Sequence, residues 1–154
     1  MVCLGNICRS PLAQGILEDK IKKYNLPWYV DSAGTSGWHD GESPDARARA
    51  VARKKGITID KQISREITDA DFNAFDLICA MDAQNYAELK RMSERIKGSA
   101  TIELLLNLAY PGKNAQVPDP YYDGKFEEVY DLLDKALEKI ALVKLPEIIQ
   151  YSKN

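Results

Sequence analysis

The feature that most constrains this sequence is a nearly continuous apolar run at its centre, Phe75-Asp76-Leu77-Ile78-Cys79-Ala80-Met81. A strand with one wet face alternates apolar and polar residues, whereas an unbroken run is typical of a strand buried on both faces. Such strands occur in parallel sheets that helices cover on either side. Asp82 then indicates the cap of a helix that continues to about Met92. The run predicts an α/β layout with Cys79 as inert core.

Strand and helix patterns alternate along the chain. Helices are expected at Pro11–Tyr24, Asp45–Lys55 and Phe126–Leu145, and short strands at Trp28–Val30 and Ala100–Glu103, the latter followed by an irregular turn. Ser10 and Pro11 suit the N-cap and first position of the first helix. This alternation predicts a doubly wound parallel sheet, in which ligands bind beyond the carboxyl ends of the strands.

Length and composition exclude several classes of protein. The chain has 154 residues and a net charge of −2, so we expect a single domain, 1–154, that does not bind nucleic acid. It has no run of roughly 20 apolar residues and no signal-peptide pattern, so no membrane association is expected. Its three cysteines lack the spacing of a secreted disulfide framework, which favours a cytoplasmic setting. With His39 as its one histidine, neither a metal nor a cofactor is expected.

The segment from Cys3 to Ser10 is a short loop that leads into a helix N-terminus. Inward-pointing amides and the positive end of a helix suit an anion, and Arg9 can grip two oxygens of a phosphate at once. The same positive field favours the thiolate form of Cys3. The Cys-x5-Arg spacing alone is weak, and Cys3 could instead be a small buried hydrophobe at a strand end. The loop lacks the G-x-x-x-x-G-K-[ST] pattern of nucleotide-binding loops.

Two further loops carry candidate site residues. The loop at 31–42 contains Trp38, which either binds a ligand or packs onto its own surroundings, and His39, which we expect to be an ordinary surface residue. In the other loop, prolines on both sides of Asp119 fix the backbone and prevent a helix. They would hold one carboxylate in place beside Tyr121 and Tyr122, although a plain Asp-Pro turn is the alternative.

Together, Val2–Pro11, Asp31–Ser36 and Asp119–Tyr122 resemble the low-molecular-weight protein tyrosine phosphatase family, and the resemblance covers essentially the whole chain. It implies a flavodoxin-like, four-stranded parallel sheet with helices on both faces. It also implies that Cys3 is the nucleophile and Asp119 the general acid. Phosphate would bind to Arg9 and to the loop amides of Leu4, Gly5, Asn6, Ile7, Cys8, Arg9 and Ser10.

The resemblance assigns supporting roles as well. Ser10 would hydrogen-bond the thiolate, and Asn6 with Ser32 would hold the shape of the loop. The walls of the cleft would be Leu4, Trp38, Tyr121 and Tyr122. The implied substrates are phosphotyrosine-containing proteins or peptides and small aryl phosphates, with inorganic phosphate as the product. Cys8 would either pack beneath the loop or join Cys3 reversibly under peroxide.

The chain departs from the family pattern at two places. Family members usually carry several apolar residues before the nucleophile, whereas here only Met1 and Val2 precede Cys3. A central strand this short loses ladder bonds, so we expect lower stability than in a version with the strand restored. Many members also have a histidine that supports the loop, but the corresponding region here reads Asp60–Arg65 without one.

Three alternatives share part of this pattern. Arsenate reductases of the same fold need two further redox cysteines, and here only Cys79 remains outside the loop. Protein-arginine phosphatases tend to carry Thr where Ile7 stands, so Ile7 favours tyrosine. A non-catalytic phosphate-binding module would need no acid, and Asp119 argues against it.

Overall fold

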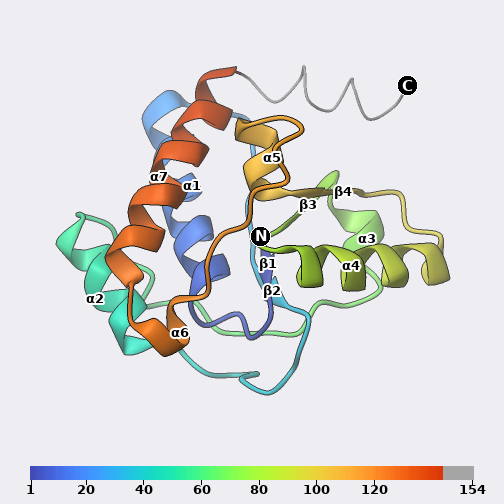
Figure 1. Ribbon diagram of the computed structural model, residues 1–154, viewed down its shortest axis with the longest axis horizontal. Helices are drawn as coiled ribbons and strands as arrows, with labels where there is room; N and C mark the ends of the chain where they lie inside the picture. Colours follow the sequence, from blue (N-terminus) through green and yellow to red (C-terminus); the bar gives the residue numbers. More distant parts are fainter. Residues whose placement is uncertain (144–154) are drawn as a thin grey trace.

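A computed structural model describes residues 1–143 of the chain, and residues 144–154, with the expected end of the last helix at Leu145, lie outside this range. Its centre is a four-stranded sheet in the order β2-β1-β3-β4, and every paired neighbour is parallel (Figure 1). The strands are β1 (Val2–Cys3), β2 (Ala33–Gly34), β3 (Leu77–Ala80) and β4 (Thr101–Leu104). The predicted parallel α/β fold is therefore confirmed.

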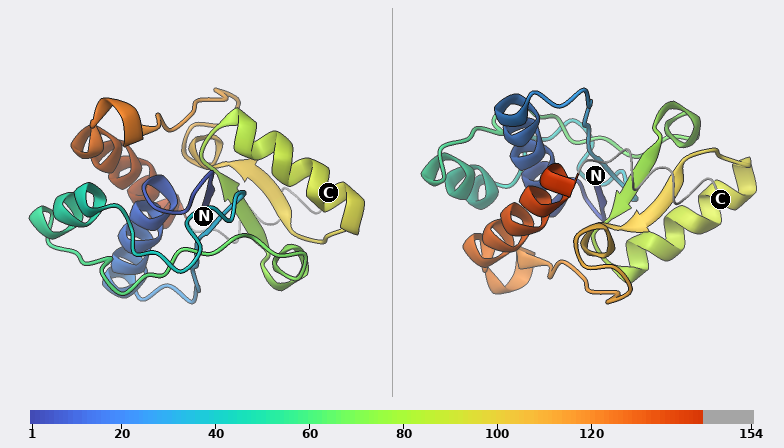
Figure 2. Two further views of the ribbon diagram at one scale, coloured as in Figure 1. Left: turned by 90° about the horizontal axis from the view of Figure 1, so that it is seen from below. Right: turned by 90° about the horizontal axis from the view of Figure 1, so that it is seen from above.

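Helices cover both faces of this sheet (Figure 2). One face carries α1 (Arg9–Tyr24), α2 (Ala46–Lys54) and α7 (Phe126–Val143), and the other carries α3 (Asp71–Ala74) and α4 (Ala83–Ile96). Two short helices complete the described chain, α5 (Leu105–Ala109) and α6 (Pro120–Asp123). Within residues 1–143, none of the helices combines the length and apolar character needed to cross a membrane.

Two hydrophobic cores hold the layers together. Leu12 and Ile16 of α1 meet Leu133 and Leu137 of α7 in the first core, and all four side chains are fully buried. The second core lies on the opposite face, where Phe72, Leu89, Ile78 and Ile102 pack together. Burying each such side chain contributes about 1.5–3 kcal/mol, so both faces of the sheet are firmly anchored.

The apolar run at the centre forms β3, as predicted, and β3 pairs with β4 from Leu77↔Thr101 to Ala80↔Leu104. Cys79 is buried within it, and burial raises the pKa of its thiol to about 11. A thiol in this environment stays protonated and unreactive near neutral pH.

The central strand β1 is short, with Val2 and Cys3 as its two residues. It pairs with β2 at Val2↔Ala33 and Cys3↔Gly34, but with β3 only at Val2↔Ala80. A small cavity of about 30 Å³ lies beside this end of the strand, lined in part by Met1, Val2, Leu77 and Ile78. The sheet thus has its fewest ladder contacts at its centre.

Two expectations for the secondary structure were wrong. The second strand is Ala33–Gly34 and not Trp28–Val30, because pairing with the two residues of β1 overrides the β-propensity of the earlier segment. The turn expected after β4 is the helix α5, whose buried face includes Leu105, Leu106 and Ala109.

The starts of two helices, α1 and α6, also differ from the prediction. The first helix begins at Arg9 with Cys8 at the N-cap position, so Ser10 lies inside the helix and its hydroxyl is not a cap. A helix was not expected after Asp119, yet α6 begins at Pro120 with Asp119 as its N-cap. Proline suits the first helical position, where its missing N–H would have no partner inside the helix.

Candidate active site

The three residues predicted to carry the chemistry meet in one pocket beyond the carboxyl end of β1. Cys3 ends that strand, Arg9 begins α1, and Asp119 precedes α6 more than a hundred residues later. The pocket has a volume of about 290 Å³. It is lined by Cys3, Leu4, Gly5, Ile7, Cys8, Arg9, Ser36, Trp38, His39, Asp119, Tyr121 and Tyr122.

Several backbone carbonyl groups of the Cys3–Ser10 loop accept hydrogen bonds from the surrounding protein. Those of Cys3, Leu4 and Ile7 accept hydrogen bonds at 2.8–2.9 Å from backbone N–H groups at positions 35, 36 and 45. The Gly5 carbonyl accepts one from Ser64 Oγ at 3.0 Å. By contrast, within residues 1–143 none of the backbone N–H groups at positions 4–10 has a protein acceptor. The loop therefore offers amides to an anion.

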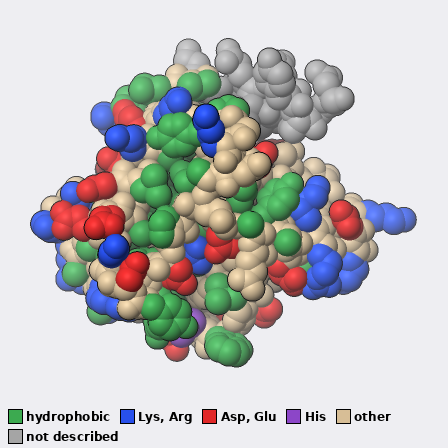
Figure 3. Space-filling view, in the orientation of Figure 1, with side chains coloured by type: hydrophobic (Ala, Val, Ile, Leu, Met, Phe, Trp, Pro, Cys, Tyr) green, Lys and Arg blue, Asp and Glu red, His purple; other side chains and the backbone are tan. Residues whose placement is uncertain are grey.

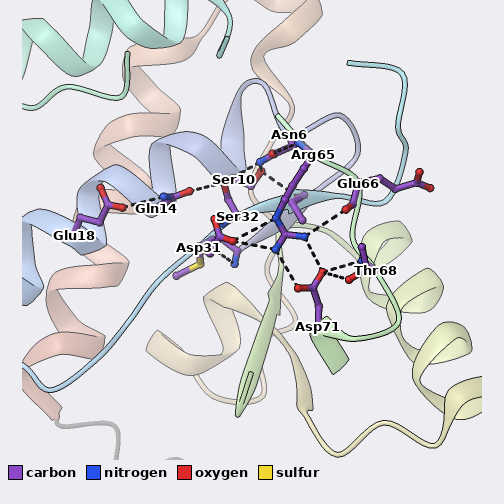
Figure 4. Close-up of polar contacts among 12 residues, drawn as sticks. Asn6, Ser10, Gln14, Glu18, Asp31, Ser32, Arg65, Glu66, Thr68 and Asp71 are labelled. Atoms are coloured by element: carbon purple, nitrogen blue, oxygen red, sulfur yellow. Dashed lines mark hydrogen bonds and ion pairs between the residues drawn. The ribbon is translucent and has the colours of Figure 1, made fainter. Parts of the chain in front are cut away.

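Asn6 holds the loop in shape from within. Its φ of 54° is left-handed, a conformation that asparagine tolerates better than most residues. Its side-chain Nδ2 donates to Ser10 Oγ at 2.8 Å and to Ser32 Oγ at 2.9 Å. Its Oδ1 accepts from the Arg65 backbone N–H at 3.1 Å (Figure 4). Ser32 in turn donates to Gln14 Oε1 at 2.6 Å, so the chain of hydrogen bonds reaches α1.

Ser10 connects this network to Cys3. The Cys3 Sγ lies 3.0 Å from Ser10 Oγ, and both residues are buried. The Ser10 oxygen accepts a hydrogen from Asn6, and its own hydroxyl hydrogen can be donated to the sulfur at 3.0 Å or to the Ala33 carbonyl at 3.5 Å, of which the sulfur is the nearer acceptor. This arrangement can stabilise a thiolate.

Arg9 is held by two groups that the sequence did not identify as part of a site. Its Nη1 donates to Asp82 Oδ2 at 2.7 Å and to the Val117 carbonyl at 3.1 Å. Its Nη2 lies 3.8 Å from Asp119 Oδ2. The Arg9 side chain is only 5% exposed, so these contacts fix its direction. Asp82 was predicted only as a helix cap, a role it also fills by accepting from the Asn85 N–H at 2.7 Å.

Asp119 has one oxygen bound and the other turned to the pocket. Oδ1 caps α6 by accepting from the Tyr121 N–H at 3.0 Å, while Oδ2 faces Arg9. Arg47 steadies the same turn, because it donates to the Tyr121 carbonyl at 3.1 Å and lies over the Tyr121 and Phe126 rings at 5.4 and 4.6 Å. The sequence pattern gives no sign of this role for Arg47.

The predicted wall residues surround the mouth of the pocket. Trp38 and Tyr122 are 91% and 89% exposed, and Leu4 and Tyr121 are also exposed. The two tyrosine rings meet edge to face with centroids 5.0 Å apart. Hydrophobic side chains gather beside the single histidine, purple in Figure 3, at the edge where α6 lies in Figure 1. These rings can pack against an aromatic group.

His39 lies on the pocket, where an ordinary surface residue was expected. A Cβ added to Gly5 would come within 2.9 Å of the His39 Cδ2, so the ring rests on the glycine. The His39 Nδ1 is 2.7 Å from Glu42 Oε2. The sequence carried no signal for this contact, because the loop that brings His39 to Gly5 has no regular structure.

Arg65 and Ser64 support the loop in the region where many family members have a histidine. The Arg65 guanidinium lies between two carboxylates, with bonds of 3.0 Å to Asp31 Oδ2 and 2.8 Å to Asp71 Oδ2 (Figure 4). Burial disfavours the Asp71 carboxylate, but hydrogen bonds from Arg65 and Thr68 outweigh that effect and lower its pKa. The charged cluster thereby anchors the Arg65 amide that holds Asn6.

Cys8 lies at the N-cap of α1 and lines the pocket beside Cys3. It is buried and unpaired with any other cysteine. Burial, with a smaller contribution from Asp45, raises the pKa of its thiol far above the ordinary value. Cys8 is therefore a neutral thiol under ordinary conditions.

Comparisons with known proteins identify relatives of this chain. Residues 1–150 match the family model described as low molecular weight phosphotyrosine protein phosphatase. The chain is 41% identical over 141 residues to the low molecular weight protein-tyrosine-phosphatase YfkJ of Bacillus subtilis, covering 90% of each protein. It is 42% identical over 134 residues to the human low molecular weight phosphotyrosine protein phosphatase, covering 84% of each.

Solved structures show the same fold. The crystal structure of YfkJ superposes with a TM-score of 0.84 at 40% identity, covering 99% of this chain and 94% of that one. A Drosophila protein described as an arginine phosphatase superposes with a TM-score of 0.84 at 33% identity, covering 99% and 96%. The chain belongs to the low molecular weight phosphotyrosine protein phosphatase family.

Proposed function

We propose that this protein hydrolyses phosphotyrosine and small aryl phosphate monoesters through a phosphocysteine intermediate. The observation that carries the proposal is the meeting of Cys3, Arg9 and Asp119 in one pocket, next to loop amides that have no protein acceptor. A thiol, an anion cradle and a carboxylate are the parts needed for such a reaction without a metal or cofactor.

In the first step, the phosphoryl group of the substrate occupies the loop amides and Arg9. The Cys3 thiolate attacks phosphorus in line, so the S–P bond forms while the bond to the aryl oxygen breaks. Asp119, protonated at Oδ2, gives its proton to the departing oxygen. The Ser10 hydroxyl, 3.0 Å from the sulfur, supports the thiolate before attack.

In the second step, the Asp119 carboxylate takes a proton from water as the water attacks phosphorus. The S–P bond breaks, inorganic phosphate leaves, and the thiolate and the acid are restored. The amides and Arg9 stabilise the equatorial oxygens in both steps. Because Oδ1 is occupied by the Tyr121 amide, Oδ2 is the oxygen that exchanges protons.

The walls of the pocket favour an aromatic leaving group. Trp38 and Tyr122 are almost fully exposed at its mouth, where they can pack against a phenyl ring and the peptide that carries it. Phosphotyrosine-containing proteins or peptides are therefore the proposed partners, with inorganic phosphate as the released product.

Phosphoarginine is the second candidate substrate, because the Drosophila neighbour is described as an arginine phosphatase. In this chain Ile7 lines the pocket at the position where arginine phosphatases tend to carry threonine. An apolar side chain there favours the aryl ester. Parallel assays on one peptide sequence bearing either phosphotyrosine or phosphoarginine distinguish the two.

The central test uses nitrophenyl phosphate in the presence of a chelator. Wild-type protein should turn it over, Cys3→Ser should be inactive, and Asp119→Ala should lose about 10²–10⁴ in kcat. Acid-quenched wild-type enzyme should carry a phosphoryl group on the peptide containing Cys3. Full activity of Cys3→Ser, or loss of wild-type activity to the chelator, would contradict the mechanism.

We further propose that residues 1–154 act as a single domain in the cytoplasm.

We also propose that Cys8 is a redox partner of Cys3. Peroxide would oxidise the Cys3 thiolate to a sulfenic acid, and the Cys8 thiol would then form the disulfide with release of water. A dithiol would restore both groups. Peroxide-treated wild type should recover with dithiothreitol, whereas Cys8→Ser should recover less; equal recovery would contradict this role.

A further inference from the structure

The positive charges that line the pocket are few. Among its lining residues only Arg9 and His39 can carry a positive charge. Arg9 is already partly neutralised, since its Nη1 lies 2.7 Å from Asp82 and its Nη2 lies 3.8 Å from Asp119. A phosphate dianion that enters this pocket gains from any second cation at its mouth.

The contacts of His39 suit it to that task. Its Nδ1 is 2.7 Å from Glu42 Oε2, which places a hydrogen on Nδ1 and leaves Nε2 for another partner. The ring rests on Gly5 of the loop, where an added Cβ would lie 2.9 Å from Cδ2 and 3.6 Å from Nε2. With a side chain 32% exposed, His39 is open to solvent and to a ligand. Glu42 would also stabilise the doubly protonated ring.

We propose that His39, oriented by Glu42, is a second cationic binding residue for the phosphate group of the substrate and of the product. The proposal deepens the proposed phosphatase function and rests on it. In the free protein, Glu42 holds Nδ1. When a phosphate dianion binds in the loop, Nε2 takes up a proton from water and the imidazolium then lies between two anionic groups.

Other charged groups act on the same ring. Arg9 lines the same pocket as His39, and so do Cys3 and Asp119, which can each carry a negative charge. Asp40, on the same loop as His39, and Glu66, on a neighbouring segment, also place carboxylates around Gly37. Asp40 and Glu66 are present in both conditions, so they do not account for a change on phosphate binding.

The single histidine makes this measurable. The imidazole Hε1 signal of wild-type protein is followed by NMR as the pH is varied, with and without inorganic phosphate. Phosphate should move the titration midpoint upward by about half to one pH unit. Saturable shifts of the loop amides at positions 4–10 with no movement of the imidazole midpoint would overturn the role of His39 and leave the proposed function standing. Loop amides that do not respond to phosphate would overturn both.

Kinetics give an independent readout with matched variants. At about pH 5.5, where an ordinary histidine is charged, His39→Gln should raise the KM for nitrophenyl phosphate about threefold to tenfold relative to wild type. At about pH 8 the ratio of the two KM values should approach one. Glu42→Gln should give a smaller increase, and Asp69→Asn, which removes an exposed carboxylate that pairs with Arg95, should give none. A KM ratio for His39→Gln that is the same at both pH values would overturn the proposal.

Discussion

The Arg9 guanidinium lies 2.7 Å from Asp82, a residue that also caps the helix α4. One carboxylate oxygen of Asp82 contacts Arg9 and the other contacts the N–H of Asn85, so the pocket and the helix α4 on the other face of the sheet share a single side chain. The pair is largely shielded from water, with Arg9 almost completely buried. Asp82 therefore directs Arg9 toward the pocket.

Asp82→Asn tests this relationship. The amide oxygen can still cap α4, but the charge that holds Arg9 is lost. Because a small misplacement of a binding group costs catalysis steeply, we expect kcat/KM for an aryl phosphate to fall about tenfold or more. Asp69→Asn, which breaks the exposed pair with Arg95, serves as the control and should leave activity unchanged. An unchanged kcat/KM in Asp82→Asn would contradict the positioning role.

Asn6 should be a stability determinant as well as part of the loop. Asn6→Ala removes its three hydrogen bonds, each worth about 1 kcal/mol, and adds about 1 kcal/mol of strain from the left-handed backbone. Urea unfolding should therefore show a loss of about 4 kcal/mol for Asn6→Ala and about 3 kcal/mol for Asn6→Gly, which escapes the strain. Asn25→Ala, at a helix end with φ 50°, should cost only the strain. Equal losses in the alanine and glycine variants of Asn6 would refute the backbone contribution.

The Arg65 cluster predicts an acid-dependent contribution to stability. The pKa of Asp71 is lowered in the folded state, so its carboxylate stabilises the fold above the ordinary aspartate pKa of about 3.9. That contribution disappears as the pH falls through the lower folded value. Asp71→Asn should destabilise the protein by about 1–2 kcal/mol at neutral pH, and the difference from wild type should shrink toward about pH 3. A difference that stays constant with pH would argue against the charge pairing.

The short central strand predicts a route to higher stability. Leu77 and Ile78 of β3 pair with β4 but not with β1, and a small cavity adjoins Met1 and Val2. A variant with several apolar residues added ahead of Met1 should extend the ladder and melt at a higher temperature. Equal melting temperatures for the two chains would refute this expectation.

Much of the fold could be predicted from the sequence, and so could the position of Cys3 and Arg9 at one end of the sheet. The unbroken apolar run of β3 and the strand-helix alternation are local patterns, and the rule for parallel sheets then places Cys3 and Arg9 at one edge. Asp119 entered the site by resemblance, because local rules alone do not show where a late loop returns.

The remaining features depend on tertiary contacts. The local sequence predicts that Asp82 caps a helix. It does not predict that the second carboxylate oxygen of Asp82 binds Arg9, which is 73 residues away in the chain. Arg47 carries no local sign that it covers Tyr121, and His39 reaches Gly5 through an irregular loop. β1 and β2 have only two residues each, which is too short for strand propensity to predict them. The position of β2 is set by its pairing with β1.

The network around Asn6 has a consequence for how affinity arises in this protein. Side chains or amides from α1, from the segment before β2 and from Arg65 already hold the loop in place. The conformational entropy of ordering the anion cradle is therefore lost when the chain folds, and little remains to be lost when a ligand arrives. The free energy of folding therefore already includes the cost of ordering the loop. On heating or in denaturant, activity should be lost at the same midpoint as global unfolding, because the loop does not unfold before the rest of the protein.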